Sequence, residues 1–240
     1  MKKFICLAFI LFAAIGIFAQ DAQEKPIEKS EFDKISLNSF RKFAGQSYRQ
    51  TEVVTGVLES ILPSPIEDKR QNNFSSKSIT EFSFADRGSR TIYEFDSSTF
   101  KKKTETIRVG NKIYIRIDEG EWAEEKPDIR QKFENKLKMI EEKIEYKSLG
   151  TEKLDSQNTS VYAKIQKQKL VNESNKSEMS VTVTTKYWFG EDGGKLKEEV
   201  QRESHVKSGK STIETISNSL GVTIWELDPG IKIEAPITEK

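Results

Sequence analysis

Residues 107–117 read IRVGNKIYIRI, which is two segments of alternating apolar and polar residues separated by Gly110 and Asn111. A period of two places successive side chains on opposite sides of an extended strand. Gly and Asn both tolerate the positive φ angles of a two-residue hairpin turn. This stretch therefore predicts an antiparallel hairpin, and the same pattern recurs along most of the chain.

Further strands are predicted on both sides of this hairpin. Before it, Phe82 and Phe84 alternate with polar residues and are followed by a polar turn at 85–89. Residues 51–62 fit a helix or a strand, but their β-branched content and Gly56 favour a strand in the first part. The other predicted strands cover residues 91–95, 161–165, 179–187, 195–206 and 212–216, with a turn at 191–194.

Two segments have helical periodicity instead. Pro127 suits a first helical turn, and the apolar residues that follow recur every three or four positions, at Ile129, Phe133, Leu137, Ile140 and Ile144. A second helix is predicted near residues 32–45, with its end at Gly45 and an apolar side made of Phe32, Ile35, Phe40 and Phe43.

The strands are apolar on one face only, so we expect a sheet that is covered on one side and wet on the other. No linker rich in Pro or Ser divides the chain, which favours a single domain over residues 32–240. The predicted fold class is mainly β (α+β): a strongly curved antiparallel sheet that forms an incomplete barrel, with its concave face covered by the two amphipathic helices.

The beginning of the chain predicts export. Residues 4–18 are an apolar run behind Met1-Lys2-Lys3, shorter than the roughly 20 residues that span a bilayer. We therefore interpret residues 1–19 as a cleavable signal peptide, residues 20–31 as a flexible polar leader, and the mature protein as periplasmic or secreted. Cys6, the single cysteine, leaves with the signal peptide.

Residues suited to catalysis or metal binding are scarce. His205 is the single histidine and lies in a charged strand end, and a zinc site made of His and Cys side chains cannot be assembled. The 39 Lys and Arg residues are interspersed with 38 Asp and Glu residues, unlike the basic patches of nucleic-acid-binding proteins. We expect a monomer that is not an enzyme and needs no cofactor, no metal and no nucleic acid.

Three segments together resemble bacterial exported proteins of the lipoprotein-carrier superfamily, the Lol-type chaperones and related lipid-binding envelope proteins. They read VGNKIYIR (109–116) leading to GEW (120–122), KYWFG (186–190) leading to GKLKE (194–198), and LDPGIKIEAPI (227–237). The second departs from the family pattern, with Gly190 where an acidic residue is common and Lys195-Leu196 where Leu-Pro is common. The resemblance implies a curved half-barrel with a cavity for acyl chains.

The predicted function is that of an exported carrier for a lipid or an acylated protein, with transient contact to a membrane or an envelope protein. The alternative is a non-catalytic structural or protein-interaction domain whose core is filled by its own side chains. The candidate cavity residues are apolar side chains of the predicted strands and of the first predicted helix: Phe82, Phe84, Ile107, Val109, Ile113, Ile115, Ile117, Ile129, Phe133, Leu137, Val181, Val183 and Tyr187.

Overall fold

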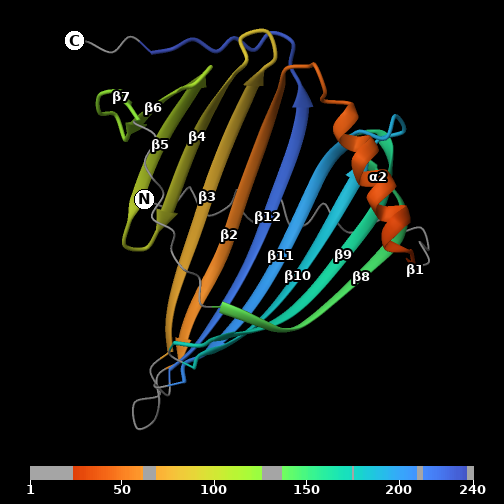
Figure 1. Cartoon of the computed structure of the whole chain (residues 1–240), viewed down its shortest axis with the longest axis vertical. Helices are drawn as coiled ribbons and strands as arrows, with labels where there is room; N and C mark the ends of the chain where they lie inside the picture. Colours follow the sequence, from red (N-terminus) through yellow and green to blue (C-terminus); the bar gives the residue numbers. More distant parts are fainter. Residues whose placement is uncertain (1–23, 62–68, 126–136, 175, 210–212, 237–240) are drawn as a thin grey trace, which may run out of the picture.

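The described residues form one antiparallel sheet of 12 strands, with a single helix among them (Figure 1). The computed structural model describes residues 24–61, 69–125, 137–174, 176–209 and 213–236. The elements are β1 (Lys25–Pro26), α2 (Lys29–Arg41), β2 (Tyr48–Ile61), β3 (Lys69–Ser83), β4 (Gly88–Ser97), β5 (Lys101–Val109), β6 (Lys112–Ile117), β7 (Ala123–Glu124), β8 (Leu137–Leu154), β9 (Gln157–Asn172), β10 (Glu178–Phe189), β11 (Lys195–Lys207) and β12 (Glu214–Leu227).

The sheet consists of two meanders, which are joined by the pairing of β2 with β12. Strands β2 to β7 follow one another in space, and so do strands β8 to β12. Strand β12 pairs with β2 along its whole length, from Glu214 opposite Ile61 to Leu227 opposite Tyr48. The edges formed by β1 and β8 and by β6 and β7 do not pair with each other, so the sheet is not closed into a barrel. The predicted antiparallel sheet is confirmed.

The hairpin at residues 107–117 forms as predicted. Val109 lies opposite Lys112, which leaves Gly110 and Asn111 as the two turn residues, and Gly110 has a φ of 59°. The ambiguous segment at 51–61 is a strand, part of β2. The predicted turns at 85–89 and 191–194 also separate strands.

Helix α2 corresponds to the helix predicted near residues 32–45. Its Phe32 side chain is buried and lies against the rings of Tyr146 and Tyr187, at centroid distances of 4.9 and 5.3 Å. These contacts fix the helix on β8 and β10 at the wide end of the sheet (Figure 1). The predicted leader is ordered in part, because β1 pairs with β8 and α2 begins at Lys29.

The predicted helix at 127–144 is wrong over the part that the structure describes. Leu137, Ile140 and Ile144 lie in β8, which pairs with β9; Ile129 and Phe133 lie outside the described residues. Ile140 is an extra residue in this ladder, at a bulge between Met139 and Glu141. A bulge shifts the alternation by one, so Leu137 and Ile144 share a face of the strand despite their spacing of seven. The same apolar pattern thus fits a bulged strand.

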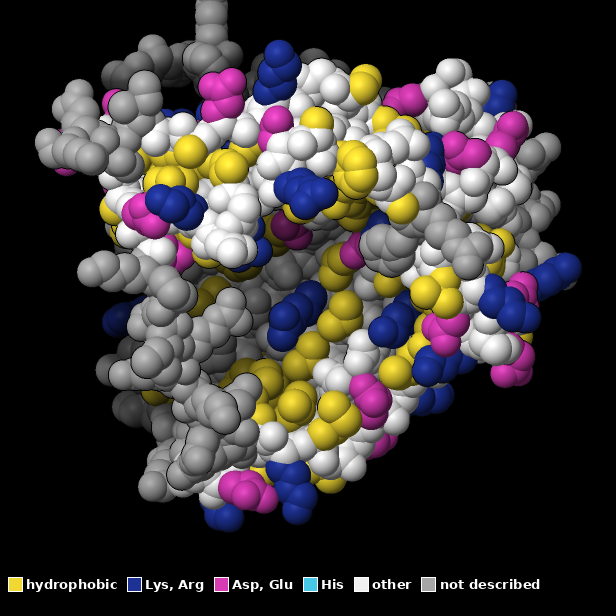
Figure 2. All heavy atoms as spheres, turned by 45° about the horizontal axis from the view of Figure 1, so that its top comes forward, with side chains coloured by type: hydrophobic (Ala, Val, Ile, Leu, Met, Phe, Trp, Pro, Cys, Tyr) yellow, Lys and Arg dark blue, Asp and Glu magenta, His cyan; other side chains and the backbone are white. Residues whose placement is uncertain are grey.

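The expectation that helices cover a concave face is not supported. Among the described residues α2 is the single helix, and its contacts lie at one end of the sheet. Figure 2 shows the molecule deeply hollowed, with hydrophobic and basic side chains inside the hollow. No helix of the described residues is long and apolar enough to cross a membrane.

Gly56 allows a close approach between three strands. A Cβ atom there would lie 2.3 Å from Cζ of Phe74 and 2.8 Å from the backbone oxygen of Asn218. At Gly221 on the neighbouring strand, a Cβ atom would lie 3.4 Å from Val54 Cγ2, an ordinary contact. The two glycines therefore form a matched pair for substitution.

We predict that Gly56→Ala lowers the free energy of unfolding by about 1–3 kcal/mol, because the added carbon must displace a ring or a backbone. Gly221→Ala should change it by less than about 1 kcal/mol. Urea unfolding of both variants measures the difference. Equal losses at the two positions would contradict the close packing at Gly56.

Candidate functional site

The strand register divides the side chains of the sheet into two faces. We call the face that bears Tyr146 and Tyr187, the partners of Phe32 in α2, the helix face. Its opposite is the pocket face. Because side chains alternate along each strand, the pairing register assigns every paired residue to one face. For example, Thr185, Val200, Gly221 and Val54 form one row across β10, β11, β12 and β2 on the helix face.

Most of the candidate cavity residues share the helix face, but they are spread across the sheet from β8 near one edge to β6 near the other. Val181 is buried there, and Val183 and Tyr187 are half-buried. Phe82 stacks on Tyr48 at a centroid distance of 4.6 Å. The candidates that the register assigns to this face are Phe82, Ile113, Ile115, Ile117, Leu137, Val181, Val183 and Tyr187.

Ile107 and Val109 do not belong with Ile113, Ile115 and Ile117, although the sequence grouped all five. The two-residue turn pairs Val109 with Lys112, so Ile113 lies opposite Arg108 and points to the other face. Phe84 follows the end of β3, and 62% of its surface is exposed. Two candidates, Ile129 and Phe133, fall outside the described residues.

Ile107 instead belongs to a small core that the C-terminal segment completes. Ile231 and Ile233 are buried against Ile107, with Val109 and Trp122 packed beside them. The backbone N–H of Ile233 donates a hydrogen bond to Oδ2 of Asp86 at 2.8 Å, which fixes the segment over the turn between β3 and β4. The signal for this contact in the sequence is the apolar alternation of residues 231–233, within the segment that resembles the lipoprotein carriers.

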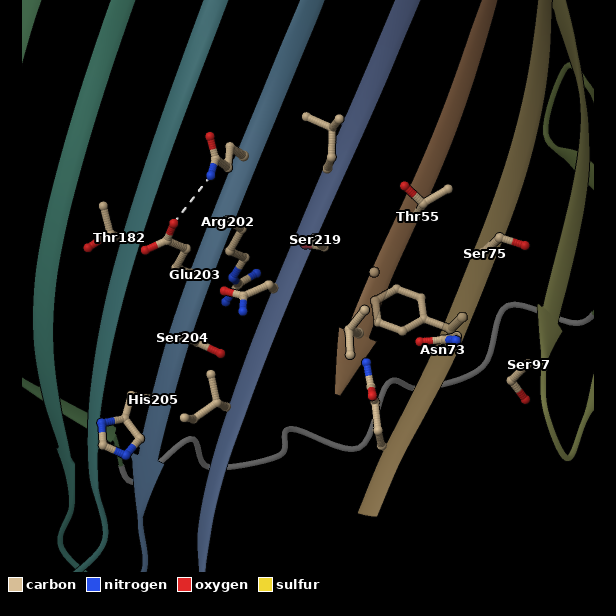
Figure 3. Close-up of a pocket in the computed structure, with 18 of the residues that line it drawn as sticks. Thr55, Asn73, Ser75, Ser97, Thr182, Arg202, Glu203, Ser204, His205 and Ser219 are labelled. Carbon is tan, nitrogen blue, oxygen red and sulfur yellow. Dashed lines mark hydrogen bonds between the residues drawn. The ribbon is translucent and has the colours of Figure 1, made fainter. Parts of the chain in front are cut away.

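A pocket of about 1450 Å³ lies on the pocket face and extends from β10 to β4 (Figure 3). Two register rows form most of its floor. One row contains Gln201, Leu220, Thr55, Ser75 and Asp96. The next contains Thr182, Glu203, Asn218, Val57 and Asn73.

Each row of this floor has an aliphatic side chain near its centre. Leu220 and Val57 come from the adjacent strands β12 and β2, and Ile216 continues the stripe towards the beginning of β12. The cross-strand neighbours of Leu220 and Val57 are uncharged and polar, whereas Ile216 lies between His205 and Glu59. None of the candidate cavity residues within the described part of the chain lines this pocket.

His205 lies at the end of the pocket and pairs with an acidic residue. Its Nε2 atom is 2.8 Å from Oε2 of Glu214. The hydrogen bond from His205, with help from Lys207, holds the pKa of the Glu214 carboxyl below its usual value. A histidine that assists nucleophilic catalysis has a hydroxyl or thiol partner, whereas His205 contacts a carboxylate. The described residues contain no group of three or more His, Cys, Asp or Glu side chains that could hold a metal ion.

A buried carboxylate on β5 links three strands farther along the pocket face. Glu105 is 3% exposed and accepts hydrogen bonds from Arg90 on β4, at 2.6 Å, and from Arg116 on β6. The guanidinium of Arg116 also lies over the ring of Trp122, 4.8 Å from its centroid. Burial raises the pKa of the Glu105 carboxyl, but the hydrogen bonds and charges of Arg116 and Arg90 outweigh burial and keep it below its usual value.

Comparisons with known proteins do not assign a family. No family model and no curated protein matches the chain. The translocator domain of the autotransporter NalP from Neisseria meningitidis is 12% identical over 81% of this chain and 96% of its own, with a TM-score of 0.24. The S-type phycobiliprotein lyase CPES from Guillardia theta is 10% identical over 85% of this chain and 99% of its own, with a TM-score of 0.25. Neither likeness is close enough to support a conclusion about fold or function.

We predict that Glu105→Gln lowers the free energy of unfolding at pH 7 by about 2 kcal/mol, since two arginines lose a charged acceptor. The pKa of Glu105 is depressed in the folded state, so its stabilisation is present above the unfolded pKa and is lost as the pH falls through the folded pKa. The difference between variant and wild type should therefore shrink below about pH 4.5.

Urea unfolding between pH 3 and pH 7 tests this prediction. Glu94→Gln is the control, because the exposed Glu94 carboxylate lies 3.7 Å from Lys103 in a solvated pair on the preceding strand. It should cost less than about 1 kcal/mol. If Glu105→Gln lowers the free energy of unfolding by the same amount at every pH, the stabilising role of the ionised Glu105 carboxylate is contradicted.

Proposed function

We propose that this protein is an exported, non-catalytic carrier that binds a lipid or an acylated protein through the helix face of its sheet. One observation carries the proposal: the apolar side chains of this face extend far beyond the helix that packs on it. A sheet with an apolar face needs a second apolar layer to cover that face. A bound acyl chain can supply this layer.

The contacts of α2 and the residues just after it are confined to the wide end of the sheet. Phe32 contacts Tyr146 and Tyr187, and Phe43 lies against Tyr48 at a centroid distance of 5.0 Å. Farther along the strands the same face bears Val183, Val200, Val54, Phe74 and Phe95, all of them half-buried. Phe74 and Phe95 stack on one another at 6.4 Å.

Export and the ligand class rest on the sequence. The apolar run at residues 4–18 has the length and flanks of a signal peptide, and the segments around 109–122, 186–198 and 227–237 resemble lipoprotein carriers. A cavity that receives acyl chains is what that resemblance implies. The ligand contacts on the helix face are the part of the proposal that substitution can test.

We predict that the purified protein binds 11-(dansylamino)undecanoic acid and that Val183→Asp weakens this binding at least about tenfold, because a carboxylate on an apolar face must keep water beside the chain. Thr184→Asp is the matched control, since the next residue on β10 is also half-buried but points to the pocket face. It should leave the affinity within about twofold of wild type. Fluorescence titration measures all three proteins.

The proposal fails if wild type does not enhance probe fluorescence, or if the two aspartate variants bind equally well. The alternative hypothesis, a non-catalytic structural or protein-interaction domain, would then replace the carrier proposal. Mass spectrometry of an organic extract of the purified protein provides a second readout, in which a carrier is expected to release co-purified lipid.

A further inference from the structure

The pocket on the pocket face has a chemistry that does not suit an acyl chain. Its lining residues are mainly uncharged and polar, with side chains that both donate and accept hydrogen bonds, such as Thr55, Asn73, Gln201 and Asn218. Covering them with methylene groups would leave these polar groups without partners, at a cost in free energy. The ligand of this pocket must therefore be rich in hydrogen-bonding groups itself.

The charges around the pocket disfavour an anionic ligand. The lining residues Asp96, Glu199 and Glu203 are acidic, and the first two form ion pairs with Lys101 and Lys197, at 2.7 and 3.4 Å. The one arginine among the lining residues, Arg202, belongs by register to the helix face. Glu203 accepts a hydrogen bond from Gln201 at 3.2 Å and remains an exposed carboxylate. Beside the Glu203 carboxylate, phosphates, sulfates and nucleotides would be repelled.

The arrangement of the floor favours an elongated ligand with one apolar and several polar sides. Leu220, Val57 and Ile216 alternate between β12 and β2 in three successive rows and form a staggered aliphatic stripe, with Asn218 between the two β12 residues. Polar and charged side chains border the stripe on β3 and β11. Successive rows are about 6.6 Å apart along the strands. The stripe thus offers repeated sites of similar composition.

An extended peptide is the obvious alternative ligand. However, the strands of the floor have no free backbone groups with which a peptide could form a ladder of hydrogen bonds. Both central strands are paired on both sides, β12 with β11 and β2, and β2 with β12 and β3. Strand addition requires a free sheet edge. Side chains alone must therefore supply the hydrogen bonds to the ligand. This favours a ligand with hydroxyl groups, because each hydroxyl can both donate and accept.

We propose that this pocket binds a neutral oligosaccharide chain. The C–H faces of the sugar rings lie on Leu220, Val57 and Ile216, and their hydroxyls bond to the amides of Asn73, Asn218 and Gln201. The floor side chains named here lie on the opposite face of the sheet from most of the proposed acyl-binding surface, and Phe74 is the residue of that surface that also lines the pocket. The further inference therefore does not depend on the proposed function.

Adjacent residues on β3 provide a matched test. Asn73 lines the pocket, whereas Asn72 is also exposed but points by register to the opposite face. The one contact of Asn72 with the lining is a long hydrogen bond, 3.4 Å, that its Oδ1 accepts from Ser98. Isothermal titration of the full chain uses cellohexaose, maltohexaose and chitohexaose as probes, with hexagalacturonate as the anionic comparison. We expect at least one neutral hexasaccharide to bind with a Kd below about 1 mM and hexagalacturonate to bind more weakly.

Asn73→Leu should weaken that binding at least about tenfold, and Asn72→Leu should leave it within about twofold. Circular dichroism and thermal unfolding of both variants check that the sheet remains folded, and both should still bind the dansylated fatty acid. If none of the three neutral hexasaccharides binds, or if Asn72→Leu weakens binding as much as Asn73→Leu, the oligosaccharide site is refuted. Those outcomes would leave the acyl-binding proposal untouched.

Discussion

The pairing of β12 with β2 is the interaction on which the rest of this structure depends. It joins the meander of β2 to β7 with that of β8 to β12, and it runs without a break from Glu214 and Ile61 to Leu227 and Tyr48. Without it, neither half would have a sheet wide enough for the pocket, whose floor crosses this seam. The paired strands are far apart in the sequence, so closing this loop is the step that should limit folding.

The second consequence of this pairing is a sheet with two chemically different faces. The register aligns Val200 with Val54 across the seam on one face and Gln201 with Thr55 on the other. A slip of one residue between β12 and β2 would exchange these sets. The helix face would then lose its apolar surface, and the pocket would lose its polar borders. Both proposed sites therefore depend on a single register.

Local sequence patterns predicted local structure well and longer-range packing poorly. The turn at Gly110 and Asn111 and the strand at 179–187 follow from neighbouring residues, and both are confirmed. The helix at 127–144 was wrong at Leu137 and Ile144, because an unpaired bulge residue reproduces a helical spacing within a strand. The pocket could not be predicted, because its floor brings together residues such as Asn218 and Val57 that become neighbours only after the two meanders pair.

Disulfide cross-linking across the seam tests this account most directly. In a Cys6→Ser background, Thr55→Cys combined with Leu220→Cys should form a disulfide on mild oxidation, because the two residues are paired and share the pocket face. Thr55→Cys combined with Ser219→Cys should not, since Ser219 points to the helix face. Efficient cross-linking of the second pair, or none of the first, would contradict the register on which both faces depend.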